Sequence, residues 1–151
     1  MRATTCGVVV TDGEQIVLGH VTGTSRWDIP KGGQAPGESF MITAIRELYE
    51  ETGLVASPSQ LTELGPFCYR PDKDLILFLW HVDQLPNPKM LRCGSHCFDR
   101  SGKTPPEFDK FRLAGWDELP HRLPKRLAGI IDALSKSPLV KRPKVPMPMV
   151  A

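Results

Sequence analysis

Three glutamates, Glu47, Glu50 and Glu51, are spaced so that a single helix would present their carboxylates together. The stretch around them, 39–52, contains neither proline nor glycine, and its apolar residues recur at spacings of three and four, which predicts a helix. At about 100° per residue, the three positions fall within an arc of about 100°. Carboxylates held this close repel one another, and their oxygens are hard ligands suited to Mg²⁺ or Mn²⁺. The spacing predicts a divalent-cation site; the alternative is a solvated acidic face.

The predicted helix also carries an apolar stripe, on the side away from the glutamates, that should face a core. Its members are Met41, Ile45, Leu48 and Thr52. Gly53 then supplies a C-terminal stop, because glycine readily adopts the left-handed conformation that ends many helices. The helix is therefore predicted to have a core side and an acidic side.

Glycine and proline cluster just before this helix, at Gly32, Gly33, Pro36 and Gly37. These residues cannot share one regular element, so they predict a loop. A loop of this kind would place backbone groups beside the carboxylates, where phosphates and a metal ion can meet. Arg46 lies four residues before Glu50 and can hold that carboxylate in place; an ordinary surface ion pair is the alternative.

Segment 32–54 resembles the Nudix box: a glycine, five residues, a glutamate, seven residues, then Arg-Glu-Leu-x-Glu-Glu-x-Gly-Leu. The match holds at all the fixed positions, which are Gly32, Glu38, Arg46, Glu47, Leu48, Glu50, Glu51, Gly53 and Leu54. The preceding stretch, 27–31, also looks like the lead-in that is usual in the family. The resemblance implies an α/β fold, an α/β/α sandwich with a mixed β-sheet between helices. It also implies hydrolysis of a nucleoside diphosphate linked to another group, by attack of water on phosphorus.

The resemblance further implies roles for the box residues. The expected cofactor is Mg²⁺, with Mn²⁺ as a substitute, and its expected ligands are Glu47, Glu50, Glu51 and a backbone carbonyl near Gly32 or Gly33. Glu38 and Gly53 are expected to be structural: Glu38 lies at the positive end of the helix and can hold the loop. Arg46 is expected to be one of the catalytic residues.

The general base varies within the family, and two glutamates are candidates here. One is Glu50 of the box. The other is Glu107, in a Pro-Glu-Phe-Asp stretch that resembles bacterial RNA 5′-pyrophosphohydrolases and dinucleoside polyphosphate hydrolases. The alternative for Glu107 is a loop carboxylate that merely precedes a strand, and the sequence leaves the roles of the two exchangeable.

Four further residues are candidates for binding the substrate. Tyr69 lies sixteen residues after Gly53, which resembles the dinucleoside polyphosphate branch, where a tyrosine stacks on or borders the base. The cationic candidates for phosphate contacts are Lys31, Arg70 and Lys73. The alternatives are packing for the tyrosine and ordinary surface or turn charges for the cations.

The predicted substrate is therefore a nucleotide, either a dinucleoside polyphosphate such as diadenosine tetraphosphate or the 5′-triphosphate end of RNA. One alternative is a MutT-like pyrophosphohydrolase of damaged nucleoside triphosphates. Another, from a different class, is a nucleotide sensor without catalysis. A sensor would be expected to have lost box carboxylates, and all three are present here.

Composition agrees with a soluble enzyme. The net charge of +2 among 151 residues excludes a protein that coats polyanions, so no DNA partner is expected. The N-terminal apolar run is too short for a signal peptide and no stretch approaches a membrane span, so a cytoplasmic location and no membrane partner are expected. Cys93 and Cys97 have no second pair at zinc-site spacing and read as ordinary thiols. A homodimer is compatible with the sequence, but nothing indicates one.

A single domain is expected over residues 1–136, followed by a basic, proline-rich tail at 137–151 that is disordered or loosely draped. Strands are predicted from β-branched runs and turn signals. They cover 5–11, 15–21, 27–30, 61–69 (interrupted at 65–66), 75–82, 90–98 and 108–116. A second helix is predicted over 124–135, with proline in its first turn.

Overall fold

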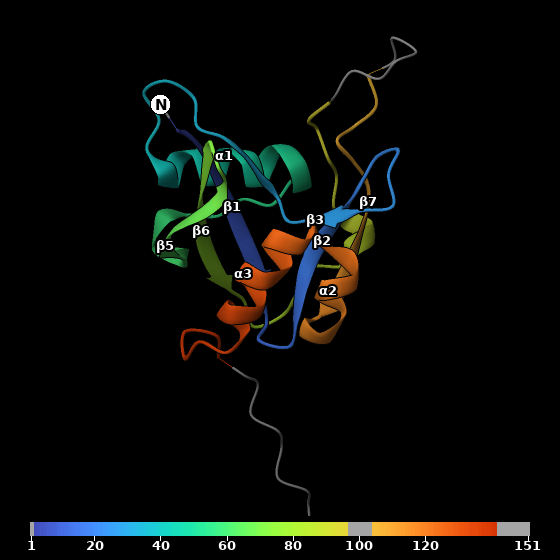
Figure 1. The fold of residues 1–151 in the computed structure, drawn as a ribbon. Coiled ribbons are helices and arrows are strands. Elements are labelled where there is room, and N and C mark those ends of the chain that lie inside the picture. The colour runs from blue at the N-terminus through green and yellow to red at the C-terminus, as the bar shows by residue number, and fades with distance from the viewer. Residues whose placement is uncertain (1, 97–103, 142–151) are drawn as a thin grey trace, which may run out of the picture.

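A mixed sheet of seven strands forms the centre of the part of the chain that the computed structural model describes, residues 2–96 and 104–141 (Figure 1). Its main path runs β3-β2-β1-β6-β5, while β4 pairs with β1 and β7 pairs with β2. Strands β1 and β6 are parallel and the other pairs are antiparallel. The strands are β1 Ala3–Thr11, β2 Gln15–Val21, β3 Trp27–Asp28, β4 Lys31–Gly33, β5 Leu61–Arg70, β6 Lys73–His81 and β7 Phe108–Gly115.

Helices cover both faces of the sheet, which confirms the predicted α/β/α sandwich (Figure 1). Helix α1 (Phe40–Thr52) packs on one face, and α2 (Leu119–Arg122) and α3 (Lys125–Ser135) pack on the other. Three short 3₁₀ turns complete the elements: η1 Pro58–Gln60, η2 Pro88–Met90 and η3 Trp116–Glu118.

The core consists of two clusters of buried apolar side chains, one on each face of the sheet. Successive residues of the central strands contribute alternately to the two clusters. On β1, Val8 and Val10 face α1, whereas Val9 faces α3, and all three are buried. On β6, Leu77 joins the α3 side and Phe78 the α1 side. Strands covered on both faces read as nearly continuous apolar runs, which is why these two strands carry the strongest signals in the sequence.

Helix α1 begins and ends where the sequence predicts. Ser39 is the N-cap, and its hydroxyl accepts a hydrogen bond from the backbone N–H of Ile42 at 3.1 Å. At the other end Gly53 adopts a left-handed conformation (φ 82°) and donates to the carbonyl of Tyr49 at 2.8 Å. Leu48 of the predicted stripe is completely buried.

Two predictions about local structure are wrong. Gly32 and Gly33 were expected in a loop but belong to β4, because Cys6 and Thr5 of β1 lie opposite them and supply an antiparallel partner. The strand expected over 90–98 is also not formed in its described part: 88–90 is a 3₁₀ turn and 91–95 is irregular, with one isolated bridge at His96. Its N–H groups reach the C-terminal end of α1 instead, where carbonyls have no partner within the helix. Residues 97 and 98 lie outside the described part.

Packing continues past the expected domain end at residue 136. Val140 is buried in the core cluster on the α3 side, and the carbonyl of Lys141 contacts Nε2 of His81 at 2.8 Å. The rest of the expected tail, 142–151, lies outside the described residues.

A glycine pair offers a direct test of the packing around β2. A Cβ at Gly19 would overlap the ring of buried Phe108, whereas a Cβ at Gly129 in α3 would meet nothing. Gly19→Ala should therefore lower the free energy of unfolding by about 1–3 kcal/mol through overpacking. The control Gly129→Ala should raise it by about 0.5–1 kcal/mol, because alanine favours the helix. Urea denaturation measures both, and a neutral Gly19→Ala would contradict the close contact with Phe108.

Candidate active site

Two of the three box glutamates are buried between α1 and the sheet. Glu51 is 3% exposed and Glu47 is 9% exposed, while the side chain of Glu50 is 41% exposed. The alternative of a solvated acidic face is therefore wrong for Glu47 and Glu51. Burial in this position means that both carboxylates need compensation from other groups of the protein or from a ligand.

Strand β4 lies directly against these carboxylates. A Cβ on Gly32 would overlap the carboxylate of Glu47, so only glycine allows the helix to approach β4 this closely. The backbone N–H of Lys31 donates to Oε2 of Glu51 at 3.4 Å. The glycines thus bring backbone groups beside the acidic side of α1.

Arg46 connects the other carboxylates of the box. Its Nε and Nη2 donate to the two oxygens of Glu38 at 2.7 and 2.9 Å. Its Nη1 donates to Glu47 at 2.8 Å and to Glu50 at 3.2 Å, and Nη2 also reaches the carbonyl of Gly33 at 3.0 Å. One guanidinium therefore neutralises part of the acidic cluster and ties α1 to β4.

Glu38 holds the loop before the helix. Besides Arg46, its Oε1 accepts hydrogen bonds from the N–H of Ala35 at 2.9 Å and from the hydroxyl of Thr43 at 3.0 Å. The bonds from Arg46, with that from Ala35, lower the pKa of Glu38 to about 2. These contacts fit the structural role expected for this residue.

The electrostatics of Glu51 differ from those of Glu38. Burial, together with the nearby charge of Glu107, raises the pKa of Glu51 to about 9, against a smaller lowering effect of Lys31. Burial also raises the pKa of Glu47, and the nearby charge of Glu107 adds to this increase. These carboxylates thus lie close enough to disfavour one another's charge, as expected for a site that lacks sufficient positive charge.

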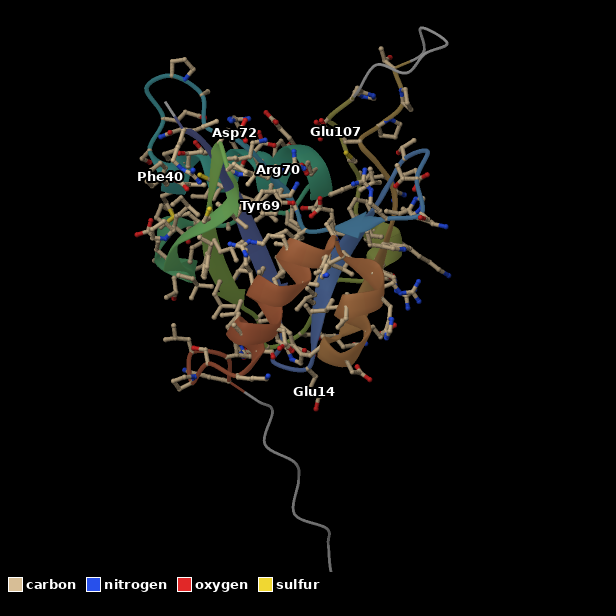
Figure 2. The ribbon with its side chains drawn as sticks, viewed as in Figure 1. Glu14, Phe40, Tyr69, Arg70, Asp72 and Glu107 are labelled. Carbon is tan, nitrogen blue, oxygen red and sulfur yellow. The ribbon has the colours of Figure 1, made fainter. Side chains whose placement is uncertain are left out.

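A cavity of about 330 Å³ lies in front of Glu51 and Glu107. Figure 2 shows Glu107 at the upper end of the molecule, the end that also carries Arg70 and lies away from Glu14. Lys31 borders this cavity and pairs with Asp28 at 2.9 Å. Burial alone lowers the pKa of Lys31, but the charge of Asp28 and its hydrogen bond to Lys31 more than offset this, so the pKa is raised and the cation is retained.

The backbone of Glu107 is held from two sides. Its N–H donates to the carbonyl of Ser95 at 2.9 Å, and its carbonyl accepts from the N–H of Thr22 at 3.1 Å. The same segment reaches α1, because the N–H of Gly94 donates to the carbonyl of Glu50 at 2.7 Å. Hydrogen bonds therefore link the last turn of α1 to Glu107, although the two are far apart in the sequence.

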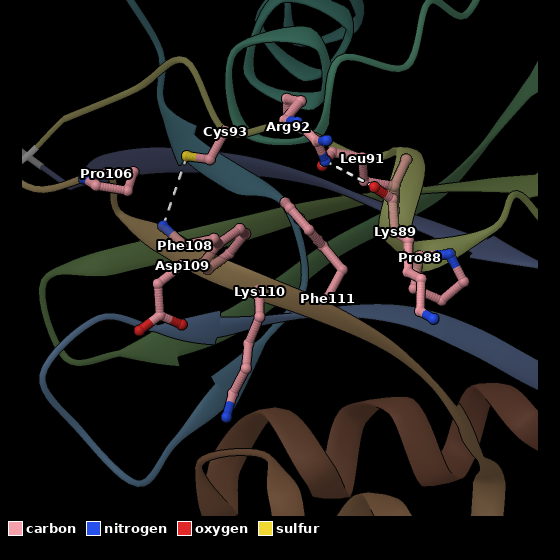
Figure 3. A pocket seen from close by; sticks show the side chains of 10 residues that line it. All are labelled: Pro88, Lys89, Leu91, Arg92, Cys93, Pro106, Phe108, Asp109, Lys110 and Phe111. Atoms are coloured by element: carbon pink, nitrogen blue, oxygen red, sulfur yellow. Dashed lines mark hydrogen bonds between the residues drawn. The ribbon is translucent and has the colours of Figure 1, made fainter.

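The side chain of Cys93 adds two hydrogen bonds next to this link. Its sulfur accepts from the N–H of Phe108 at 3.5 Å (Figure 3). It also donates to the carbonyl of Ser95 at 3.3 Å. The surrounding cavity, of about 460 Å³, lies beside β7 and includes Arg92 and Lys110 among its lining residues. The thiol thus serves local packing, as expected of an ordinary cysteine.

The donors of the acidic cluster suit a hard divalent cation in kind and in charge. All are oxygens, and burial with mutual repulsion disfavours the charged form of Glu47 and Glu51. Within the described residues, however, no three His, Cys, Asp or Glu side chains converge into a metal-binding group. Arg46 occupies oxygens of both Glu47 and Glu50.

The substrate-binding candidates gather near Lys31. Tyr69 is 8% exposed and belongs to the core cluster, and its ring centroid lies 5.9 Å from Nζ of Lys31 and 5.4 Å from Cζ of Arg70. So small an exposed area leaves little of the tyrosine ring for stacking. Lys73 and Lys31 border a second cavity of about 400 Å³, next to Gly32.

Comparison with known proteins identifies the family. A family model described as the NUDIX domain matches residues 1–134. The chain belongs to the Nudix family. It is accordingly a hydrolase that acts on phosphoric anhydride bonds, and Nudix hydrolases generally use divalent metals.

Two relatives of this Nudix chain match it at 34% identity. An uncharacterised 17.7 kDa protein of Enterobacteria phage T4 is 34% identical over 124 residues, which cover 75% of this chain and 82% of the phage protein. An RNA pyrophosphohydrolase of Erythrobacter litoralis is 34% identical over 101 residues, which cover 62% of each chain. The match thus spans less than two thirds of that enzyme.

A solved structure with the same fold is a bifunctional NMN adenylyltransferase/ADP ribose pyrophosphatase of Francisella tularensis, complexed with AMP and a Mn ion. It superposes with a TM-score of 0.65 at 16% identity, over 89% of this chain and 42% of the other. At this identity the likeness concerns the fold alone. No helix within residues 2–96 and 104–141 is long and apolar enough to cross a membrane.

Several residues of the site carry no signal in the sequence. The ion pair of Lys31 with Asp28 and the contact of Ser95 with Glu107 depend on the folded arrangement. Arg2, which borders the cavity beside Gly32, is also invisible to motif analysis. Only the pair Asp28–Lys31, at a spacing of three, could have drawn attention, and short spacings of opposite charges are common.

Glu51→Gln should stabilise the metal-free protein at alkaline pH. The carboxyl ionises near pH 4.5 in an unfolded chain but near 9 in the fold, so its stabilising effect is complete below about pH 4.5 and is lost as the pH rises toward 9. With a chelator present, the variant should melt at the wild-type temperature at pH 5 and about 3 °C or more above it at pH 8.5. Exposed Glu14→Gln is the control, and an equal shift at both pH values would contradict the raised pKa.

Proposed function

We propose that this Nudix enzyme is a divalent-metal-dependent pyrophosphohydrolase that cleaves a phosphate chain attached to more than a single nucleoside. The substrate would be a dinucleoside polyphosphate or the 5′-triphosphate end of RNA. The observation that carries the proposal is a pair of cavities that share Lys31. One is lined by Glu51 and Glu107, and the other is lined by Lys31 and Lys73.

The two cavities have opposite electrostatic character, which suits the two needs of the reaction. The acidic cavity suits the metal and the phosphorus under attack. The basic cavity suits the phosphates farther along the chain, because ammonium groups attract phosphate oxygens. Lys31 lies between them and keeps its charge, so it can contact the bridging region of the substrate.

The residues that would hold the metal are Glu47, Glu50 and Glu51, with the backbone carbonyl of Gly32. When bound, Mg²⁺ or Mn²⁺ reduces the repulsion between the anionic phosphate and its nucleophile and steadies the leaving phosphate. Arg46 would release part of its contact with Glu47 and Glu50 and continue to hold Glu38, so that the helix and β4 stay together.

Glu107 is the better candidate for the general base. It borders the acidic cavity and its backbone is held on both sides, and no ion pair to its carboxylate is formed among the described residues. Glu50, by contrast, is paired with Arg46 at 3.2 Å. The Glu107 carboxylate would accept the proton of water as its oxygen bonds to phosphorus, and the anhydride bond breaks with departure of the phosphate group.

The relatives support this substrate class. RNA pyrophosphohydrolases appear among them, and an RNA 5′ end and a dinucleoside polyphosphate both present several linked phosphates. Tyr69 would border the nucleotide with the small part of its ring that is exposed, while Arg70 and Lys73 contact outer phosphates.

A substrate panel tests the proposed class. With Mg²⁺, kcat/KM should be at least about tenfold higher for diadenosine tetraphosphate or 5′-triphosphorylated RNA than for ADP-ribose, a difference of about 1.4 kcal/mol. Chelation should abolish turnover of every substrate. A preference for ADP-ribose or for a damaged nucleoside triphosphate would contradict the substrate class, and tight binding without turnover would indicate a sensor.

Two glutamine variants test the residue roles. Glu51→Gln should lower metal-dependent kcat/KM about 100-fold or more, because a metal ligand loses its charge while its shape is kept. Glu107→Gln should lower kcat by about 10²–10⁴, the range for loss of a general base. Glu14→Gln, at the opposite end of the molecule (Figure 2), should leave both parameters unchanged. Near-normal activity of Glu107→Gln would transfer the role of base to Glu50.

A further inference from the structure

The end of β5 and its turn into β6 form an irregular segment beside the basic cavity. The ladder between the two strands shifts register between Cys68 and Arg70, so Tyr69 is an extra residue opposite β6. A bulge of this kind re-aims side chains and leaves backbone groups without ladder partners. Those groups need other partners to keep the turn in one conformation.

Arg2 supplies most of these partners. Its Nη2 donates to the carbonyls of Arg70 at 3.0 Å and Lys73 at 3.3 Å, and its Nη1 donates to the carbonyl of Pro71. Its Nε donates to Oδ1 of Asp74 at 2.9 Å. One side chain therefore bonds to four residues of the segment 70–74, including both ends of the turn.

The neighbouring backbone places Arg2 for this task. The N–H of Ala3 donates to the carbonyl of Asp72 at 3.0 Å, and β1 then continues parallel to β6 with Ala3 opposite Lys73. The first residues of β1 thus run beside the turn, and Arg2 lies where its guanidinium can face the carbonyls of the turn.

We infer that Arg2 is a positioning residue that holds the turn 70–73, and with it the side chains of Arg70 and Lys73, in place for the phosphate chain of the substrate. The inference rests on the proposed function, which assigns those two side chains to phosphate binding. It adds a residue outside the Nudix box and outside the predicted site.

The donors of Arg2 explain why it acts on the turn and not on the substrate. An arginine has five N–H groups in a fixed fork. At least three of them point at acceptors of this segment, and Nη2 also lies 3.4 Å from the sulfur of Cys68. A lysine in the same place would have a single nitrogen and could not span the carbonyls of both ends of the turn.

A second arginine, which bonds to the end of the same strand β5, provides a matched control. Arg126 of α3 donates to the carbonyl of Cys68 from Nε at 2.9 Å and from Nη2 at 2.7 Å. It anchors the end of β5 from the other side and has no hydrogen bond to residues 70–74 among the described contacts. Loss of Arg126 therefore removes comparable bonds near the bulge without releasing the turn.

The test compares Arg2→Ala, Arg2→Lys and Arg126→Ala with the wild-type enzyme, using whichever substrate of the panel is turned over best. Arg2→Ala should raise KM about tenfold with kcat within about twofold, because binding weakens while the acidic cavity is untouched. Arg2→Lys should rescue little of this change, since the fork and not the charge is needed. Arg126→Ala should leave KM within about twofold.

Hydrogen exchange separates positioning from a general loss of stability. In Arg2→Ala the amides of 72–74 should exchange at least about tenfold faster, while those of the core strand β1 keep their wild-type rates. A uniform increase over the whole chain, an unchanged exchange rate in the turn, or full rescue by Arg2→Lys would overturn the inference.

A variant that lacks both phosphate-binding side chains, Arg70→Ala with Lys73→Ala, distinguishes the two levels of the argument. If its KM equals that of the wild type, the proposed role of the basic cavity fails. If its KM rises and Arg2→Ala alone has no effect, only the positioning role of Arg2 fails. If Arg2→Ala raises KM as a single variant, but raises it by less than about a further twofold when Arg70→Ala and Lys73→Ala are already present, Arg2 acts through the turn as inferred.

Discussion

Repulsion between buried carboxylates is the constraint on which the site depends. Helix α1 presses Glu47 against Gly32 and buries Glu51 beside the backbone of β4. Arg46 compensates part of this charge by bonding to Glu38, Glu47 and Glu50 at once. The remaining repulsion, seen in the raised pKa of Glu51, favours binding of a cation.

The sheet provides a rigid base for that arrangement. Strand β1 is buried on both faces and pairs with β4 along one part of its length and with β6 along all of it. The helix that carries the carboxylates and the turn that carries Arg70 and Lys73 are thus set against the same strand. The relative positions of the carboxylates on α1 and of the turn that carries Arg70 and Lys73 are therefore fixed by the packing of the core.

The acidic and basic sides of the site meet at one residue, Lys31. Its ammonium is held by Asp28 on one side and lies near the ring of Tyr69 on the other. A cation so placed, between a carboxylate cluster and a basic cavity, matches the charge pattern of a phosphate chain whose one end is attacked and whose other end is only held. The acidic and the basic cavity thus adjoin at this residue.

The sequence by itself determined helix α1, its end at Gly53, the two central strands and the family, because each depends on residues close together in the chain. Ser39 and Gly53 act on their own helix, and the box has a fixed spacing. Only the tertiary structure decided which glutamates are buried, that Gly32 lies in a strand, and that Ser95 and Thr22 hold Glu107. Those features are contacts between distant segments, and local propensity carries no information about them, as the wrong prediction of a strand over 90–98 illustrates. The same holds for Arg2, whose partners lie about seventy residues away in the chain.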